Sequence, residues 1–111
     1  GPAARRIEHR VAGGDVNPYL TVAAILGAAL NGIEDRAPCP APLSGNAYDQ
    51  GLAQLPGTWS QAITAFAGCD QVRRIFPAHL IENLLMTKRQ ELHYMAELTD
   101  DETVELYLDT V

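Results

Sequence analysis

Apolar positions over residues 18–31 follow a helical pattern. Asn17 followed by Pro18 is a typical helix start, because Asn caps free N–H groups and Pro is tolerated at the first helical position. We therefore predict a helix over 18–31 that stops at Gly32. Thr21 is its only strongly polar residue before its last position, so we expect this helix to be buried nearly all round.

The second half of the chain repeats the helical period in shorter segments. Helices are predicted over 58–67, 70–75, 77–98 and 100–109. We expect Thr58 to cap the first of them, and Thr99 with Glu102 to form a capping box that opens the last. In the longest helix, Lys88 can lay its stem on the apolar stripe and keep its ammonium in water. That stripe consists of Leu84, Leu85, Lys88, Leu92, Met95 and Leu98.

Two regions break the helical pattern. Four prolines and three glycines fall within residues 38–57, so we predict a long loop over 33–57 that lies over a surface. Residues 5–11, "RRIEHRV", alternate in a way that indicates a strand, although charges occur on both of its faces. The predicted fold class is therefore mainly α with one N-terminal strand.

Composition excludes several classes of protein. An apolar fraction of 47% in 111 residues indicates at most one folded domain rather than a disordered chain. The net charge of −6 comes without a basic stripe, which argues against nucleic-acid binding. No apolar run reaches the roughly 20 residues that span a membrane, and the two cysteines suit reduced thiols in a cytoplasmic protein. Since the chain starts without Met, we expect it to be part of a longer protein.

The segment "RRIEHR" carries the most specific chemistry. On a strand, Arg6, Glu8 and Arg10 share one face. A carboxylate is a hard ligand for Mg²⁺ or Mn²⁺, and guanidinium groups suit phosphate. A metal ligand between two arginines is what phosphoryl transfer needs, because negative charge spreads over the transferred group. The spacing alone also fits an exposed ion-pair strand without a function.

A resemblance decides between these alternatives. The stretch "ARRIEHRVAGGDVNPYL" at 4–20 resembles the glutamine synthetase family, whose catalytic domain carries an "ARRIE-x-R … ANPYL" segment. The later segments "GNAYDQGLAQLPGTWSQAITAF" and "ELYLDTV" are similar to the family's loop, next helix and end. Residues 1–111 are thus identified as the C-terminal portion of an α+β glutamine synthetase-like catalytic domain. The sequence of these segments most resembles the γ-glutamylputrescine (polyamine) synthetase branch of the family.

The resemblance implies an ATP-dependent ligase that joins the γ-carboxyl of glutamate to ammonia or an amine such as putrescine, through γ-glutamyl phosphate. Glu8 stands at the position of a metal ligand, for Mg²⁺ or Mn²⁺. Arg6 stands where the family binds nucleotide phosphates. Arg10 stands where the family contacts the transferred phosphoryl group and the substrate, as a catalytic and substrate-binding residue.

The resemblance also implies partners. Family members assemble identical subunits into rings, so we expect a dodecamer at full length. The C-terminal tail is expected to tether one ring to the other. These residues alone are expected to be inactive, because further metal ligands lie elsewhere in the family's domain. A non-catalytic helical assembly module derived from the family is the alternative, and the amine acceptor stays open.

Two positions depart from the family's pattern. Ala3 stands where many members carry a lysine, so a lysine contact to nucleotide is not expected there. Tyr48 in "NAYDQGL" is placed like the loop tyrosine that regulated members carry for nucleotidylation, but its flanking residues differ. Modification of Tyr48 is therefore left open.

Overall fold

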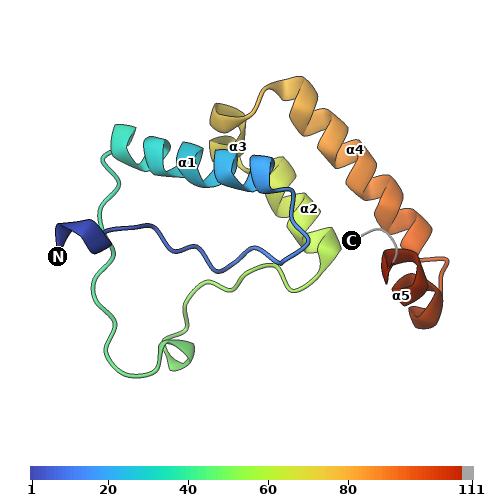
Figure 1. The fold of residues 1–111 in the computed structure, drawn as a ribbon, viewed down its shortest axis with the longest axis horizontal. Coiled ribbons are helices and arrows are strands. Elements are labelled where there is room, and N and C mark those ends of the chain that lie inside the picture. The colour runs from blue at the N-terminus through green and yellow to red at the C-terminus, as the bar shows by residue number, and fades with distance from the viewer. Residues whose placement is uncertain (109–111) are drawn as a thin grey trace.

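The computed structural model describes residues 1–108, and five α-helices make up most of this part (Figure 1). α1 packs on α3, and α2 packs on α4, so the core consists of two helix pairs rather than one layer. No strand occurs among the described residues. The helices are α1 (Pro18–Glu34), α2 (Trp59–Gly68), α3 (Asp70–Ile75), α4 (Ala78–Met95) and α5 (Asp100–Leu108), with single 3-10 turns at Pro2–Ala4 and Ala47–Asp49.

The helix starts are set by local sequence. The side chain of Asn17 accepts hydrogen bonds from the backbone N–H groups of Tyr19 and Leu20, at 3.0 and 3.1 Å. Thr58 Oγ1 likewise accepts a 3.2 Å bond from a backbone N–H in the first turn of α2. The predicted capping box opens α5: the backbone N–H of Thr99 donates to Glu102 Oε2 at 2.9 Å, and the Glu102 N–H donates back to Thr99 Oγ1. All three predicted caps are confirmed.

α3 has its predicted bounds, and α2 is displaced by one residue from the predicted 58–67, whereas the ends of the two long helices differ more. α1 continues past Gly32 to Glu34, so the prediction of a stop at Gly32 was wrong. The helix ends in a Schellman motif, in which the Ala37 N–H donates to the Gly32 carbonyl at 2.9 Å and the Arg36 N–H donates to the Ile33 carbonyl at 3.1 Å. Arg36 takes the left-handed position of this motif, with φ 49°.

α4 is also shorter than predicted, at Ala78–Met95 instead of 77–98. Pro77 has extended backbone and lies just before the helix. Beyond Met95, the backbone N–H groups of Glu97 and Leu98 each donate to the carbonyl three residues earlier. The apolar pattern that predicted a helix as far as residue 98 therefore ends in turns rather than in α-helix. The last helix is described as far as Leu108, and the predicted final residue 109 lies outside the described residues.

The predicted strand over 5–11 is not present in the structure. This segment is extended, and Figure 1 shows it running along α1, but residues 5–12 make no backbone–backbone hydrogen bond within the described part of the chain. A strand exists only when a neighbouring strand pairs with it. The alternating sequence therefore gives an extended segment here, and none of residues 1–108 pairs with it as a strand.

The environment of α1 corrects a second prediction. Only Asn31 of this helix is buried, where its amide donates to the Gln71 carbonyl at 3.3 Å. One apolar stripe of α1 is exposed along its length, with exposed fractions between 54% and 84%. The reason is that the main packing partner of α1 among the described helices is α3, which has only six residues and covers one side. The exposed stripe consists of Tyr19, Val22, Leu26, Leu30 and Ile33.

The surface of the whole molecule is correspondingly large. Its accessible area is 9437 Å², whereas a compact monomer of 12.0 kDa exposes roughly 6,000 Å². The radius of gyration is 17.3 Å, against about 13 Å for a compact domain of this length. Among the described residues, only Ile63 and Ile81 are buried hydrophobic side chains. The chain thus forms helices and pairs them, but encloses little core.

The loop between α1 and α2 extends away from the helices (Figure 1). Every residue in 33–58 is exposed, so the expectation that this loop lies over a surface was wrong for this chain. Tyr48, in the 3-10 turn Ala47–Asp49, is 92% exposed.

Among the helices that the structure describes, none combines the length and the apolar character that a membrane span requires.

Candidate functional site

The three residues singled out in "RRIEHR" come together in the structure. Glu8 accepts from Arg10 Nε at 2.6 Å, and a second nitrogen of the Arg10 guanidinium pairs with the same carboxylate oxygen. Arg6 Nη2 lies 3.9 Å from the other oxygen, Glu8 Oε2. We call these three residues the arginine–glutamate cluster. Its members meet because alternate residues of an extended segment share a face.

The cluster is open to solvent. The side chains are 50% exposed for Glu8, 71% for Arg6 and 85% for Arg10. Exposed ion pairs contribute little to stability, so an incoming anion can replace Glu8 as the partner of both guanidinium groups. Residues 5–10 contain three arginines and one glutamate, which makes this segment locally positive in an acidic chain. The cluster therefore suits an anionic ligand such as a phosphate.

The cluster fits a divalent metal only in part. Glu8 supplies one hard carboxylate ligand, which is enough for Mg²⁺ when phosphates and waters complete the shell. Within the described residues, no group of three or more His, Cys, Asp or Glu side chains could hold a metal ion. The cluster can thus contribute one ligand to a metal site that other residues complete.

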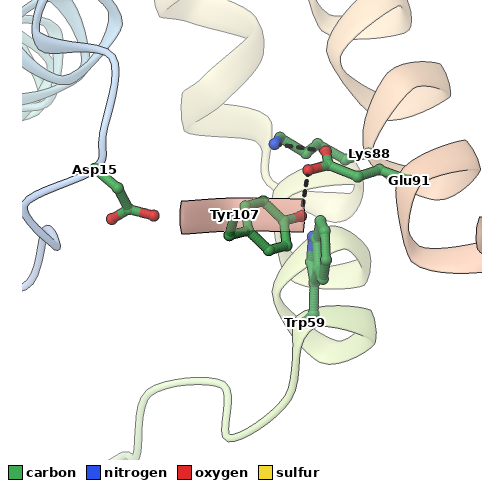
Figure 2. Close-up of a pocket in the computed structure, with 5 residues that line it drawn as sticks. All are labelled: Asp15, Trp59, Lys88, Glu91 and Tyr107. Atoms are coloured by element: carbon green, nitrogen blue, oxygen red, sulfur yellow. Dashed lines mark hydrogen bonds and ion pairs between the residues drawn. The ribbon is translucent and has the colours of Figure 1, made fainter. Parts of the chain in front are cut away.

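A second site was not predicted from the sequence. A pocket of about 500 Å³ is lined by residues from the N-terminal segment, α2, α4 and α5, which we call the tyrosine pocket (Figure 2). Its members are far apart in the sequence, so no motif joins them. The one available signal was Lys88, a charged residue within an otherwise apolar stripe. The lining residues are Asp15, Trp59, Lys88, Glu91 and Tyr107.

Glu91 is the centre of the contacts in the tyrosine pocket. Its Oε1 accepts a 2.7 Å hydrogen bond from the Tyr107 hydroxyl, and its Oε2 accepts a 2.7 Å bond from Lys88 Nζ. Lys88 Nζ also lies 5.6 Å from the centroid of the Trp59 ring, within range of a cation–π interaction. These bonds connect α2, α4 and α5 at one place.

The contacts of Glu91 shift the pKa values on both sides of its hydrogen bonds. The Lys88 and Tyr107 donors lower the pKa of Glu91, because they stabilise its charged form. The same carboxylate raises the pKa of Tyr107 to about 12, and partial burial and the charge of Asp15 act in the same direction. Glu91 is therefore ionised and Tyr107 protonated at neutral pH.

With this geometry described, comparison with known proteins assigns the family. The model of the glutamine synthetase catalytic domain matches residues 1–107, nearly the whole chain. The chain belongs to the glutamine synthetase family. The match includes the arginine–glutamate cluster and four of the five helices in full.

Relatives within the glutamine synthetase family act on different amines, as their names state. The chain is 38% identical over 96 residues to a γ-glutamylethanolamide synthetase of Streptomyces coelicolor, covering 86% of this chain and 21% of that enzyme. It is 33% identical to a glutamate–isopropylamine ligase of a Pseudomonas species, covering 98% and 24%. It is 32% identical to a γ-glutamylputrescine synthetase of Escherichia coli K12, covering 93% and 22%.

The chain thus spans between a fifth and a quarter of the length of these relatives. No solved structure matched it. The resemblance to the glutamine synthetase family read from the sequence is confirmed, and a putrescine-using enzyme is among the relatives. Because the relatives' amines differ, family membership leaves the amine of this chain open.

Proposed function

We propose that this chain works as the C-terminal part of an ATP-dependent ligase that joins the γ-carboxyl of glutamate to an amine. The observation that carries the proposal is the arginine–glutamate cluster, in which two guanidinium groups flank one carboxylate within a chain of this family. The large exposed surface supports the proposal, because a part of a larger catalytic domain leaves apolar surface for its neighbours to cover.

In this proposal the two arginines hold phosphate oxygens. Arg6 binds the phosphates of ATP, and Arg10 binds the phosphoryl group as it moves to the γ-carboxylate of glutamate, together with that substrate carboxylate. Guanidinium groups suit both tasks because they present paired donors to planar or tetrahedral oxyanions. Each arginine exchanges an exposed ion pair with Glu8 for a pair with phosphate, so the exchange costs little free energy.

Glu8 is proposed as a ligand of Mg²⁺ or Mn²⁺ once the arginines turn to phosphate. The bound cation neutralises charge on the phosphates and on the group in transfer. Glu8 contributes one oxygen ligand, and the rest of the shell comes from outside the described residues.

The acceptor is proposed to be a primary amine or ammonia. The relatives that use ethanolamine, isopropylamine and putrescine support an organic amine, and the glutamine synthetases among the relatives support ammonia. The test is to supply the complete ligase with ATP, glutamate and each candidate amine, and to identify the γ-glutamyl amide by mass spectrometry. Phosphate release without any amide would contradict ligation.

Assembly into a ring of identical subunits, a dodecamer, is part of the proposal. The side chains of Val104 and Leu108 on α5 are 57% and 73% exposed, although α5 is held to α4 by the Tyr107–Glu91 bond. We propose that this exposed face tethers the subunit to a neighbour. Val111, which has the i+7 spacing from Val104 that would place it on the same helix face, lies outside the described residues.

Deleting the residues after Thr99 tests the tether. Burial of an apolar side chain contributes roughly 1.5–3 kcal/mol, and ring symmetry repeats that contribution. The truncated ligase should therefore lose mass in light scattering as stacked rings separate, while it keeps activity within each ring. An unchanged mass would show that α5 packs on its own subunit.

The alternative function is a non-catalytic assembly module of the same family. The two proposals differ in what the complete protein does with ATP. A module that lacks the other metal ligands is not expected to bind or hydrolyse ATP. The isolated chain does not separate them, because one carboxylate and two arginines are not expected to bind ATP tightly. Calorimetry that detects tight ATP binding by these 111 residues would contradict both.

A further inference from the structure

The tyrosine pocket has the chemistry of a cation site. Its lining carries two carboxylates and one ammonium, so its net charge is −1, and two aromatic rings form its walls. Its volume of about 500 Å³ lies in the usual range for small-molecule sites. It shares no residue with the arginine–glutamate cluster. From these features we propose that the tyrosine pocket binds a primary alkylammonium ion.

Lys88 shows how the pocket receives such an ion. Its ammonium lies 5.6 Å from the centroid of Trp59 and 2.7 Å from Glu91 Oε2. A carboxylate and an aromatic face are the two partners that an alkylammonium ion needs, the first for its N–H donors and the second for its charge. The protein's own lysine therefore occupies one half of the pocket in the manner we propose for a ligand.

Asp15 is the partner left for a second ammonium. Both oxygens of Glu91 accept hydrogen bonds, whereas the carboxylate of Asp15 has no hydrogen bond or ion pair with any other described residue. Figure 2 shows this carboxylate directed toward the ring of Tyr107. A ligand ammonium placed between Asp15 and Tyr107 would gain a charged acceptor and an aromatic face, with its alkyl chain along the remaining wall.

Gly13 allows Asp15 to take this position. A Cβ atom at Gly13 would lie only 2.7 Å from Asp15 Oδ1, closer than van der Waals contact permits. Glycine thus leaves the space that the carboxylate occupies. Because the oxygen is the far end of a flexible side chain, Gly13→Ala would displace the carboxylate without unfolding the protein and without changing its charge.

The chain carries its own reporter for this proposal. Trp59 is its single tryptophan, so fluorescence excited selectively at tryptophan, at a wavelength that tyrosine does not absorb, reports on the tyrosine pocket. Titration of the full chain with n-butylammonium chloride should give a saturable change in fluorescence. The isosteric neutral 1-butanol should give none, because it lacks the charge that the carboxylate and the rings recognise. An equal response to butanol, or no saturation with butylammonium, would overturn the proposal.

Variants then locate the ion within the pocket. Asp15→Asn and Gly13→Ala should each weaken butylammonium binding about fivefold, the effect of losing one charged hydrogen-bond partner at a partly exposed site. Glu82→Gln is the matched control, since Glu82 is an exposed carboxylate on α4 outside this pocket, and it should leave binding unchanged. Unchanged binding in Asp15→Asn, with circular dichroism showing a folded chain, would refute the assignment.

Discussion

Gly27 of α1 faces Ile75 of α3, and replacing this glycine with alanine tests the packing of the helix pair. An added Cβ would lie 2.6 Å from Ile75 Cγ2 and 2.7 Å from Ile75 Cγ1. Isoleucine has two branches on its Cβ and three staggered positions for them. Rotation about χ1 therefore leaves at least one branch facing the new methyl group, so the two helices must move apart.

A matched substitution in the same helix isolates the cost of this contact. Gly32 has no atom within 4 Å of the position of an added Cβ. Gly32→Ala should stabilise the chain by about 0.5–1 kcal/mol through helix propensity alone. Gly27→Ala gains the same propensity but overpacks, at a cost of about 1–3 kcal/mol. The difference between the two variants is thus about 1–3 kcal/mol.

Urea unfolding of both variants, followed by far-UV circular dichroism, measures this difference. A third variant, Ile75→Ala, removes both branches, so adding it to Gly27→Ala should relieve the clash and make the pair non-additive. Ile75→Val would not serve, because valine keeps both branches. The reasoning would be refuted if Gly27→Ala were as stable as Gly32→Ala, or if the effects of Gly27→Ala and Ile75→Ala simply added.

Three further predictions concern single contacts. Glu91 raises the pKa of Tyr107 to about 12, so Glu91→Gln should return that pKa toward 10, which ultraviolet titration of tyrosinate measures. The stability that this hydrogen bond contributes is present below pH 10 and is lost as pH rises through 12. An unshifted titration in Glu91→Gln would contradict the bond. Arg36→Gly should raise the free energy of unfolding by about 1 kcal/mol, since glycine adopts φ 49° without strain, and a lower urea midpoint would count against the Schellman motif. The backbone N–H and then the hydroxyl of Thr99 donate to Glu102 and lower the pKa of that carboxyl, so this capping contribution is complete above the ordinary glutamate pKa and is lost as pH falls through the lowered one. Thr99→Ala keeps the backbone donor and removes only the hydroxyl, so it should reduce the acid-dependent loss of helicity, and an identical acid profile would argue against a contribution from the hydroxyl.

Short-range features of this fold could be predicted from the sequence. The caps at Asn17, Thr58 and Thr99 follow from residues within three or four positions of one another, and the structure places each as expected. The arginine–glutamate cluster was accessible for the same reason, since alternate residues of extended chain meet whether or not a strand forms. Interactions between residues that are close in the sequence therefore determine the helix caps and the arginine–glutamate cluster.

Features that depend on distant neighbours could not be predicted. Alternation over 5–11 indicates a strand, but pairing requires another segment, and this chain supplies none among its described residues. The apolar composition of α1 indicates burial, but its burial depends on which other segments pack on it, and the sequence of the helix itself does not specify them. The tyrosine pocket combines Asp15 with residues of α2, α4 and α5, which only the fold brings together.

The most direct test of the proposed ligase function is Glu8→Gln in the complete enzyme, assayed for γ-glutamyl amide formation at limiting Mg²⁺. The substitution removes one charged metal ligand and breaks only exposed ion pairs, so folding should be unchanged. Activity should fall about 100-fold or more, and the Mg²⁺ concentration for half-maximal rate should rise. Glu82→Gln should change neither quantity. Wild-type activity of Glu8→Gln at limiting Mg²⁺ would contradict a metal-binding role for the arginine–glutamate cluster.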